Sequence, residues 1–365
     1  MNKLVLANLL HRPLRSLISI LAVAIEVVMM LSIIAIMLGQ LTGQKRLNNG
    51  IGADLIVRPP NTAFFNGIGG APISVKLAPV LGALPHVTVA SPVITNLSMA
   101  NGLEVLWGID YPTYSGLSPF VFLAGGPFRG PNDVMVDDVY AGKIHHVGDT
   151  IPINKRPFRI CGIFEHGKGG RKLISIETMG QMLGDEGKAS VFYLKVDNPE
   201  NNDAVTHEIL STPGLGNYQV MTMEEWMSLM TPDQLPALKT GMNVVIGIAV
   251  IIGFLVIFQA MYTSVLERTR EIGILKSMGA SSPAIVTLVL RETVVIAIAG
   301  VALGVVVSFA VKAFFGQKFP TLYLDMNMAL VLKGAIIALV GSLLGAAYPA
   351  WMAARKDPID ALAYE

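Results

Sequence analysis

The chain has 365 residues, of which 52% are hydrophobic and only 15% are charged. Soluble proteins of ordinary composition carry about 25% charged residues, so this composition predicts an integral membrane protein. The formal net charge is only +1. Nucleic-acid-binding proteins carry a concentrated excess of basic residues, so we expect no nucleic-acid partner. Cys161 is the single cysteine, which excludes an intrachain disulfide and zinc sites built from several cysteines.

Four long apolar runs lie near the two ends of the chain. A helix of about 20 residues spans a hydrocarbon core about 30 Å thick, and each run reaches that length. The first run is too long for the apolar part of a signal peptide, so we interpret it as a retained anchor. The sequence therefore predicts an α-helical membrane protein with four transmembrane helices, one before and three after a long polar insert: Leu17–Leu38, Met242–Met261, Thr293–Phe315 and Leu330–Trp351.

Lysine and arginine predict the orientation of these helices. They concentrate in residues 1–16, in the 263–292 loop and at Arg355 and Lys356, whereas the 316–328 connection is poor in them. Basic segments flanking membrane helices stay in the cytoplasm. We expect a multi-pass membrane protein with both termini in the cytoplasm.

These boundaries divide the chain into three parts. Residues 1–41 form the cytoplasmic N-terminus and transmembrane helix 1, and residues 42–238 form an extracytoplasmic domain. Residues 239–365 hold transmembrane helices 2 to 4, a cytoplasmic helix at 264–281 and a cytoplasmic C-terminal tail.

The extracytoplasmic domain has the pattern of a mixed α/β fold. Short β-branched or alternating segments, bounded by Gly, Pro and Asn, predict six strands: Ala53–Arg58, Val87–Ile94, Leu103–Ile109, Val134–Val136, Phe158–Phe164 and Val191–Val196. Glu177–Leu183 and Pro199–Leu210 predict short helices, the second one capped by Asn198.

Three further features of this domain concern its division into lobes, an exposed loop and its histidines. Residues 115–130, rich in Gly and Pro, mark a candidate division between two lobes, and Phe64–Pro72 has the composition of a flexible loop that exposes two aromatic rings. His145, His146 and His166 are of a type that binds metal or haem, but their spacing is not diagnostic of such a site, and we expect solvated loop histidines.

The cytoplasmic segment from Glu267 to Ser281 reads ERTREIGILKSMGAS and predicts a short, imperfectly amphipathic helix. Ile272, Leu275 and Met278 recur every three residues on one side. Such a helix can anchor at the membrane by its apolar face and offer charges to a cytoplasmic partner. The alternative is a basic loop that only fixes the topology.

This segment resembles a signature of the FtsX/MacB-like ABC transporter permease family, the mechanotransmission (type VII) class. So does the tail from Tyr348 to Leu362, YPAWMAARKDPIDAL, and the stretches His146–Ile151 and Phe158–Phe164 are similar to that family's extracytoplasmic core. The resemblance implies that the cytoplasmic segment is a coupling helix that docks onto an ATPase. The implied ATPase-coupling residues are Glu267, Arg268, Arg270, Glu271, Gly273, Lys276 and Gly279.

The resemblance also implies a location in the bacterial cytoplasmic (inner) membrane, a function and partners. The chain would be a permease that has no enzymatic activity and no cofactor of its own, with ATP and Mg bound by a separate ABC ATPase subunit. A second permease copy, membrane lipid and a periplasmic adaptor protein are further implied partners. The implied function is export or extraction of a hydrophobic substrate, driven by movements of the extracytoplasmic domain. An FtsX-type regulatory module that controls an extracytoplasmic partner protein is the alternative.

Residues Gly162–Lys168 read GxxxxGK, the start of a phosphate-binding loop, and Gly169 follows. That loop requires Ser or Thr next and a helix behind it, but Gly169 occupies the position and strand-like residues follow. We therefore expect no nucleotide there.

Two features lie inside the apolar runs. Placing a charged side chain such as that of Glu26 in the middle of a membrane helix costs about 2.5–3.5 kcal/mol of insertion free energy. We therefore expect Glu26 to face other helices, either for function or as a tolerated polar residue. The pairs Gly300/Gly304 and Gly341/Gly345 have the spacing that permits close helix packing.

Overall fold

The computed structural model describes residues 13–60, 72–98, 104–319 and 321–356. They form two compact units. The helical unit holds the residues up to Gln40 and from Leu235 onward, and the α/β unit holds Leu41–Gln234. The expected extracytoplasmic domain began one residue later and ended four residues later than this unit.

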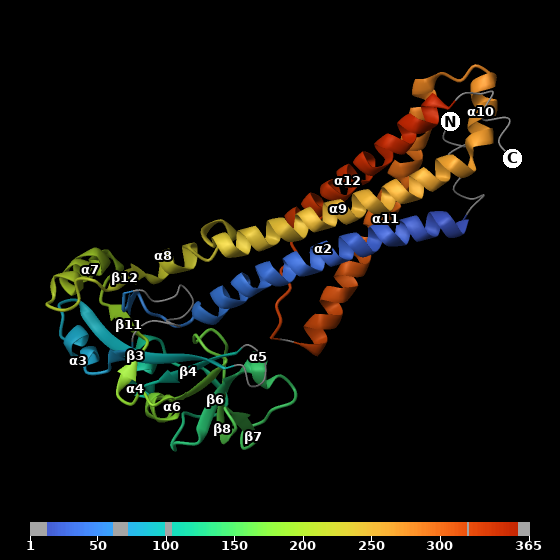
Figure 1. Ribbon diagram of the computed structural model, residues 1–365. Coiled ribbons are helices and arrows are strands. Elements are labelled where there is room, and N and C mark those ends of the chain that lie inside the picture. Colours follow the sequence, from blue (N-terminus) through green and yellow to red (C-terminus); the bar gives the residue numbers. More distant parts are fainter. Residues whose placement is uncertain (1–12, 61–71, 99–103, 320, 357–365) are drawn as a thin grey trace. The chain divides into compact units, whose positions relative to one another are not determined.

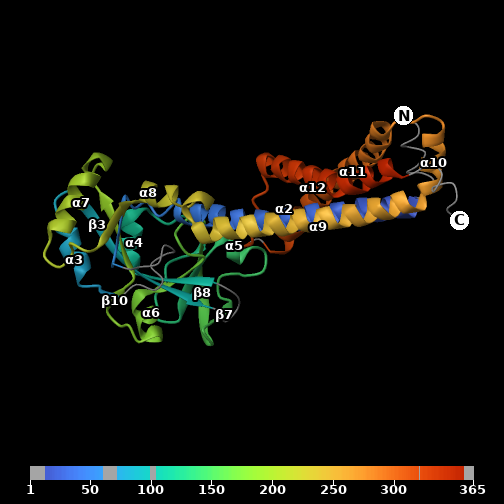
Figure 2. The same ribbon diagram turned by 45° about the horizontal axis from the view of Figure 1, so that its top comes forward.

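Four long helices make up most of the helical unit (Figures 1 and 2). By length and composition, each can cross a membrane. They confirm the expected arrangement of one helix before the α/β unit and three after it. Each is longer than the apolar run that predicted it, because the helix continues into flanking polar residues. The helices are α2 (Pro13–Asn48), α9 (Pro236–Glu267), α11 (Ser282–Lys318) and α12 (Met328–Arg355), and a short α10 (Thr269–Ser277) follows α9.

Small residues let α11 approach α2 closely. A Cβ atom added to Gly300 would lie 2.6 Å from Cβ of Val23, and one added to Gly304 would lie 2.8 Å from Cβ of Val27. Both distances are too short for a side chain larger than hydrogen. The Gly300/Gly304 pair therefore serves helix packing, as its spacing predicts.

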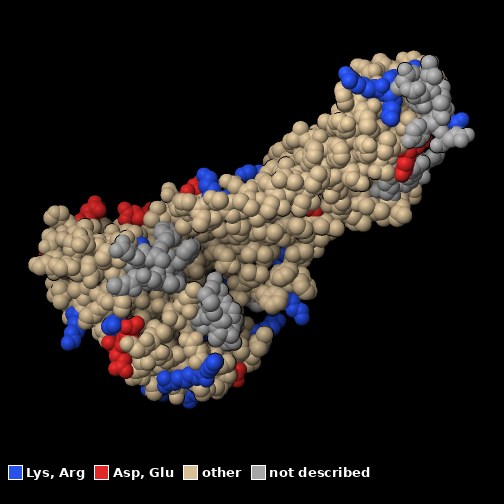
Figure 3. Space-filling model, in the orientation of Figure 1, with Lys and Arg blue, Asp and Glu red and all other residues tan. Residues whose placement is uncertain are grey.

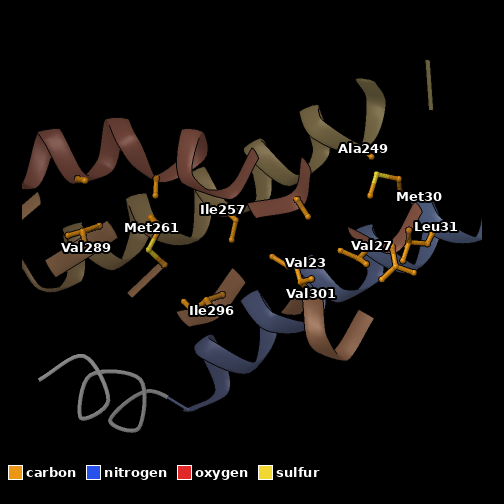
Figure 4. Close-up of a cluster of buried hydrophobic side chains, with 14 of the residues drawn as sticks. Val23, Val27, Met30, Leu31, Ala249, Ile257, Met261, Val289, Ile296 and Val301 are labelled. Carbon is orange, nitrogen blue, oxygen red and sulfur yellow. The ribbon is translucent and has the colours of Figure 1, made fainter. Parts of the chain in front are cut away.

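The helices α9 and α12 meet in the same way. A Cβ atom on Gly345 of α12 would lie 2.6 Å from the carbonyl oxygen of Phe254 in α9. Aliphatic side chains from α2, α9 and α11 fill the interior of the helical unit (Figure 4). Members labelled there include Val23, Val27, Met30, Leu31, Ala249, Ile257, Met261, Val289, Ile296 and Val301.

The outward surface of the long helices is apolar as well. Ile251, Val306 and Leu332 have 59%, 66% and 60% of their surface exposed. In Figure 3 much of the visible surface over these helices lacks charged side chains, which reappear at the end that carries α10. A surface of this kind is suited to contact with lipid acyl chains.

A ten-stranded sheet forms the centre of the described part of the α/β unit (Figure 1). Its order is β12-β1-β11-β3-β4-β9-β6-β8-β5, and β7 pairs with β8. Among the described strands, only β4 with β9 and β6 with β8 pair in parallel. The strands are β1 (Leu55–Arg58), β3 (Val87–Ser98), β4 (Glu104–Ile109), β5 (Phe122–Gly125), β6 (Asp133–Asp137), β7 (Thr150–Ile153), β8 (Arg156–Phe164), β9 (Lys172–Ser175), β11 (Val191–Val196) and β12 (Gln219–Thr222).

Short helices and aromatic side chains complete this unit. Near the middle of the sheet, the rings of Trp107 and Tyr193 stack 5.8 Å apart, and Tyr114 meets both rings edge-on. The remaining elements are β2 (Ile73–Ser74) paired with β10 (Lys188–Ala189), α3 (Leu77–Gly82), α4 (Tyr111–Leu117), α5 (Asp138–Ala141), α6 (Ile176–Leu183), η1 (Pro199–Asn201), α7 (Asn202–Ser211), α8 (Met223–Ser228) and η2 (Pro232–Gln234).

The six expected strands are all present: Val191–Val196 matches β11 at both ends, and the bounds of the other five shift by at most four residues. The helix expected at Pro199–Leu210 begins as the 3₁₀ turn η1 before α7, and the Asn198 side chain caps it by accepting from the Glu200 amide. The expected lobe division at 115–130 is wrong, because β5 from this stretch joins the continuous sheet. Most of the expected Phe64–Pro72 loop lies outside the described residues.

Candidate functional site: the segment around α10

The coupling segment, residues 264–281, is not the single helix that its sequence predicts. Helix α9 ends at Glu267, and α10 begins at Thr269. Between them Arg268 has φ −108° and ψ 16°, outside the helical region, so the backbone bends there. The hydroxyl of Thr269 donates to the carbonyl oxygens of Val265 and Leu266 in the last turn of α9, and the Arg268 amide also donates to Leu266.

A glycine turn ends α10. Gly279 has φ +97°, a conformation that glycine adopts without the steric cost of a Cβ atom. The Ala280 amide donates to the carbonyl oxygen of Leu275 at 2.9 Å, as expected for a helix-terminating turn. Ser281 then precedes α11, with Pro283 in its first turn. The segment is therefore a short helix bounded by a bend at one end and a tight turn at the other.

Arg268 ties the bend to α11. Its Nε donates to Oε2 of Glu271 at 2.9 Å, and its Nη1 donates to Oε2 of Glu292 in α11 at 3.1 Å. The side chains of Arg268 and Glu292 are only 16% and 10% exposed, whereas that of Glu271 is 62% exposed. The Arg268–Glu292 pair is therefore largely shielded from solvent, and the Arg268–Glu271 pair is not.

Lys276 ties the other end of α10 to α12. Its Nζ donates to the carbonyl oxygens of Ala354 and Lys356 at 2.9 and 2.7 Å. These carbonyls lie at the C-terminal end of α12, where a cation is favoured by the helix dipole. The hydroxyl of Ser282 also donates to Ala354. Both ends of α10 are thus fastened, each to a different long helix.

The remaining side chains of α10 divide into a buried and an exposed face. Ile272 and Gly273 are buried, and Leu275 is partly buried. Arg270, Glu271, Ile274 and Met278 are exposed, and Met278 exposes 71% of its surface. Sequence periodicity placed Met278 with Ile272 on one apolar side. The structure corrects this because Met278 follows the last helical residue, where the backbone turns toward Gly279.

The seven residues expected to couple to an ATPase therefore occupy different positions. Glu267, Arg270 and Glu271 are exposed, and Gly279 forms the turn. Arg268 and Lys276 are engaged within the helical unit, and Gly273 packs in its interior. Sequence reasoning missed Glu292, the partner of Arg268. The one available signal was a carboxylate just before the third apolar run.

Glu26 lies in the interior of the helical unit with 6% of its surface exposed. Its carboxylate occupies the space beside Gly253 of α9, where any Cβ atom would overlap it. This arrangement places the carboxylate between helices.

The histidines of the α/β unit make separate local contacts. His166 pairs with Asp138 at 3.0 Å, His146 lies 3.9 Å from Asp149, and His145 stacks on Tyr140. Within the described ranges, no three His, Cys, Asp or Glu side chains are grouped closely enough to hold a metal ion.

Two family models match the chain. The model of the MacB-like periplasmic core domain matches residues 16–212, and that of the FtsX-like permease C-terminal region matches residues 243–358. The first match covers more than half of the chain. Together the two matches include three of the four long helices almost entirely, the coupling segment and most of the α/β unit.

Curated relatives agree with these models. The chain is 28% identical over 257 residues to the uncharacterized ABC transporter permease YknZ of Bacillus subtilis, covering 67% of this chain and 63% of that protein. It is 27% identical over 394 aligned positions to the macrolide export ATP-binding/permease protein MacB of Hahella chejuensis, covering 97% and 58%. The chain thus spans about 60% of the length of these relatives.

Among solved structures, the periplasmic region of MacB from Actinobacillus actinomycetemcomitans is similar to this chain. It is 16% identical, covers 48% of this chain and 92% of that one, and has a TM-score of 0.38. The family matches and the four apolar helices carry the assignment. The chain belongs to the FtsX/MacB-like family of ABC transporter permeases.

Proposed function

We propose that this protein is a permease that couples ATP hydrolysis on a separate ABC ATPase subunit to movements of its α/β unit. The observation that carries the proposal is the fastening of α10. Arg268 and Lys276 point inward to α11 and α12, while Arg270, Glu271, Ile274 and Met278 remain exposed. A force applied to this exposed face would therefore reach three of the long helices: α9 through the bend, α11 and α12 through the two cations.

The exposed face has the chemistry of a protein-docking surface. It combines one cation and one anion with two aliphatic side chains, and buried aliphatic anchors within a polar rim are typical of specific interfaces. Membrane lipid would contact the apolar outer faces of the long helices instead. We propose that the function is export or extraction of a hydrophobic substrate, and that ATP and Mg are bound by the ATPase.

The orientation and the assembly are part of the same proposal. Both termini and α10 would lie in the cytoplasm of a bacterium, and the α/β unit would lie outside the inner membrane, where a periplasmic adaptor could bind it. Two permease copies would pair within the membrane. Ile248 of α9, with 52% of its surface exposed, is a suitable position for a test. An Ile248→Cys variant that forms no cross-linked dimers under oxidation would weaken the case for pairing through α9.

Copurification of the ATPase tests the coupling surface. Met278→Glu and Glu271→Lys alter exposed side chains at the predicted docking face, so both should reduce recovery of the ATPase with the intact permease. Lys143→Glu, an exposed charge reversal in the α/β unit, is the matched control and should leave recovery unchanged. Full recovery and wild-type ATP hydrolysis in both α10 variants would leave the coupling segment as a loop that only fixes topology.

A further inference from the structure

The 167–170 loop joins β8 to β9 and lies against the end of the first long helix. Helix α2 runs to Asn48, and its last residues belong to the α/β unit. The amide of Gly169 donates to the carbonyl oxygen of Leu47 at 2.6 Å, and the amide of Gly50 donates to the carbonyl oxygen of Gly167 at 2.9 Å. The loop thus satisfies a carbonyl at the helix end that has no partner within the helix.

The side chain of Lys168 adds hydrogen bonds to the residues that follow α2 and α4. The side chain is buried, and Nζ donates to the carbonyl oxygen of Gly50 at 2.8 Å and to the carbonyl and hydroxyl oxygens of Ser118 at 2.9 Å each. An ammonium group has three N–H donors, so all three are used. Gly50 follows α2, and Ser118 is the C-cap of α4.

The ammonium group of Lys168 contacts neutral groups. Its three hydrogen-bond acceptors are uncharged, and the Phe120 ring lies 5.3 Å from Nζ, within cation–π range. Burial lowers the pKa of Lys168 to about 8, with an opposing effect from Glu165, so the amine stays mostly charged at pH 7. Its three donors are therefore in place under ordinary conditions.

The loop itself is fixed to the aromatic centre of the sheet. Tyr114 donates its hydroxyl to the carbonyl oxygen of Lys168 at 3.0 Å. Gly167 and Gly169 have φ values of +111° and +84°, and a Cβ atom on Gly169 would overlap the ring of Trp107. Glycine is required there by both the backbone conformation and the available space. The loop therefore has little freedom to move independently of the sheet.

We infer that Lys168 and the 167–170 loop form the fastening that makes the sheet of the α/β unit follow displacements of α2. Lys168 is a positioning residue: it acts on the helix end and on α4. The residues that read as the start of a phosphate-binding loop thus serve another purpose, because the strand β9 follows them and the amine faces protein oxygens. The local fastening follows from the contacts alone, whereas its role in transmission rests on the proposed function.

Hydrogen exchange on the full chain tests the fastening. Lys168→Met keeps the length and apolar character of the side chain but removes the amine, and Lys143→Met at an exposed lysine is the matched control. We expect amides in 47–52 and 166–171 to exchange at least tenfold faster in Lys168→Met, with 191–196 of β11 unchanged. Wild-type protection of both segments in this variant would overturn the inference.

A second measurement separates transmission from simple loss of stability. In the complex with the ATPase, fluorescent labels at Ser277→Cys and Lys143→Cys report on α10 and on the α/β unit. Lys168→Met should keep the ATP-dependent response at the first label and lose at least half of it at the second. Ile209→Val, a mild change in the buried core of the α/β unit, should keep both responses.

The outcomes bear on different claims. A full response at both labels in Lys168→Met would overturn the role of Lys168 in transmission. Loss of the second response in Ile209→Val to the same extent would also overturn it, because general destabilisation would then explain the effect. No ATP-dependent response at Ser277→Cys in the otherwise wild-type complex would refute the proposed function, while the exchange measurement would still decide the fastening.

Discussion

Arg268 offers a comparison in which one cation pairs with two carboxylates of different burial. Glu292→Gln and Glu271→Gln each replace a carboxylate by an amide of the same shape. The Glu292 side chain is 10% exposed and that of Glu271 is 62% exposed. Breaking a buried ion pair on one side costs about 3–5 kcal/mol, whereas an exposed pair contributes about 0–1 kcal/mol.

We expect Glu292→Gln to fall at the low end of that range, roughly 3 kcal/mol, because Arg268 keeps its contact with Glu271 and the amide still offers an acceptor. Amide exchange in α10 measures the local opening free energy. A cost of this size corresponds to about a hundredfold faster exchange, since each 1.4 kcal/mol is about a factor of ten. Glu271→Gln should accelerate the same amides by no more than about fivefold.

The double variant Arg268→Leu with Glu292→Leu provides the control, because replacing a shielded pair by apolar groups is often close to neutral. It should exchange more slowly than Glu292→Gln alone. Equal acceleration by Glu292→Gln and Glu271→Gln, or none by either, would show that the buried pair does not hold the bend to α11. The mechanical part of the proposed function would then lose its physical basis.

Three further predictions address other parts of the molecule. Burial raises the pKa of the Cys161 thiol to about 11. Because only the thiolate reacts, alkylation of Cys161 at pH 8 should be about a hundredfold slower than alkylation of an unperturbed thiol, and it should accelerate as the pH rises toward 11. Because Cys161 reacts slowly, it adds little background to a topology test. An impermeant thiol reagent should label Lys143→Cys but not Ser277→Cys in cells stripped of any outer membrane. The reverse labelling pattern would show that the orientation is inverted. Gly304→Leu should drive α11 away from Val27 of α2 and destabilise the helical unit by about 1–3 kcal/mol in a detergent unfolding titration, whereas Leu332→Ala at an exposed site should cost less than about 1 kcal/mol.

Sequence patterns predicted the elements whose periodicity is uninterrupted. The four long helices and six strands have apolar runs or alternation that local reasoning can detect. The sequence analysis did not predict the short strands β2, β5, β7, β9, β10 and β12. Of these, β5 and β9 were missed for different reasons. The strand β5 lies in a Gly- and Pro-rich stretch, and β9 has only four residues and begins with a buried lysine. Their pairing comes from the sheet around them.

The candidate site was less accessible to sequence reasoning. Its position in the chain was predicted, but the direction of each side chain was not. Arg268 finds its buried partner 24 residues away, and Lys276 reaches carbonyls 78 and 80 residues away. Lys168 depends on oxygens 118 and 50 residues away. Such contacts are set by tertiary packing, so a basic residue in the sequence alone does not indicate whether it faces a partner or the protein interior.

Because the inward and outward side chains of α10 are different residues, related permeases could assemble with different ATPase subunits without changing the contacts inside the helical unit. The residues that contact α11 and α12, Arg268 and Lys276, are distinct from those that remain exposed, Arg270, Glu271, Ile274 and Met278. Recognition could therefore diverge among related permeases while the internal connections stay constant. A chimera that exchanges only the four outward positions should change its choice of ATPase and still pass motion into its own membrane helices.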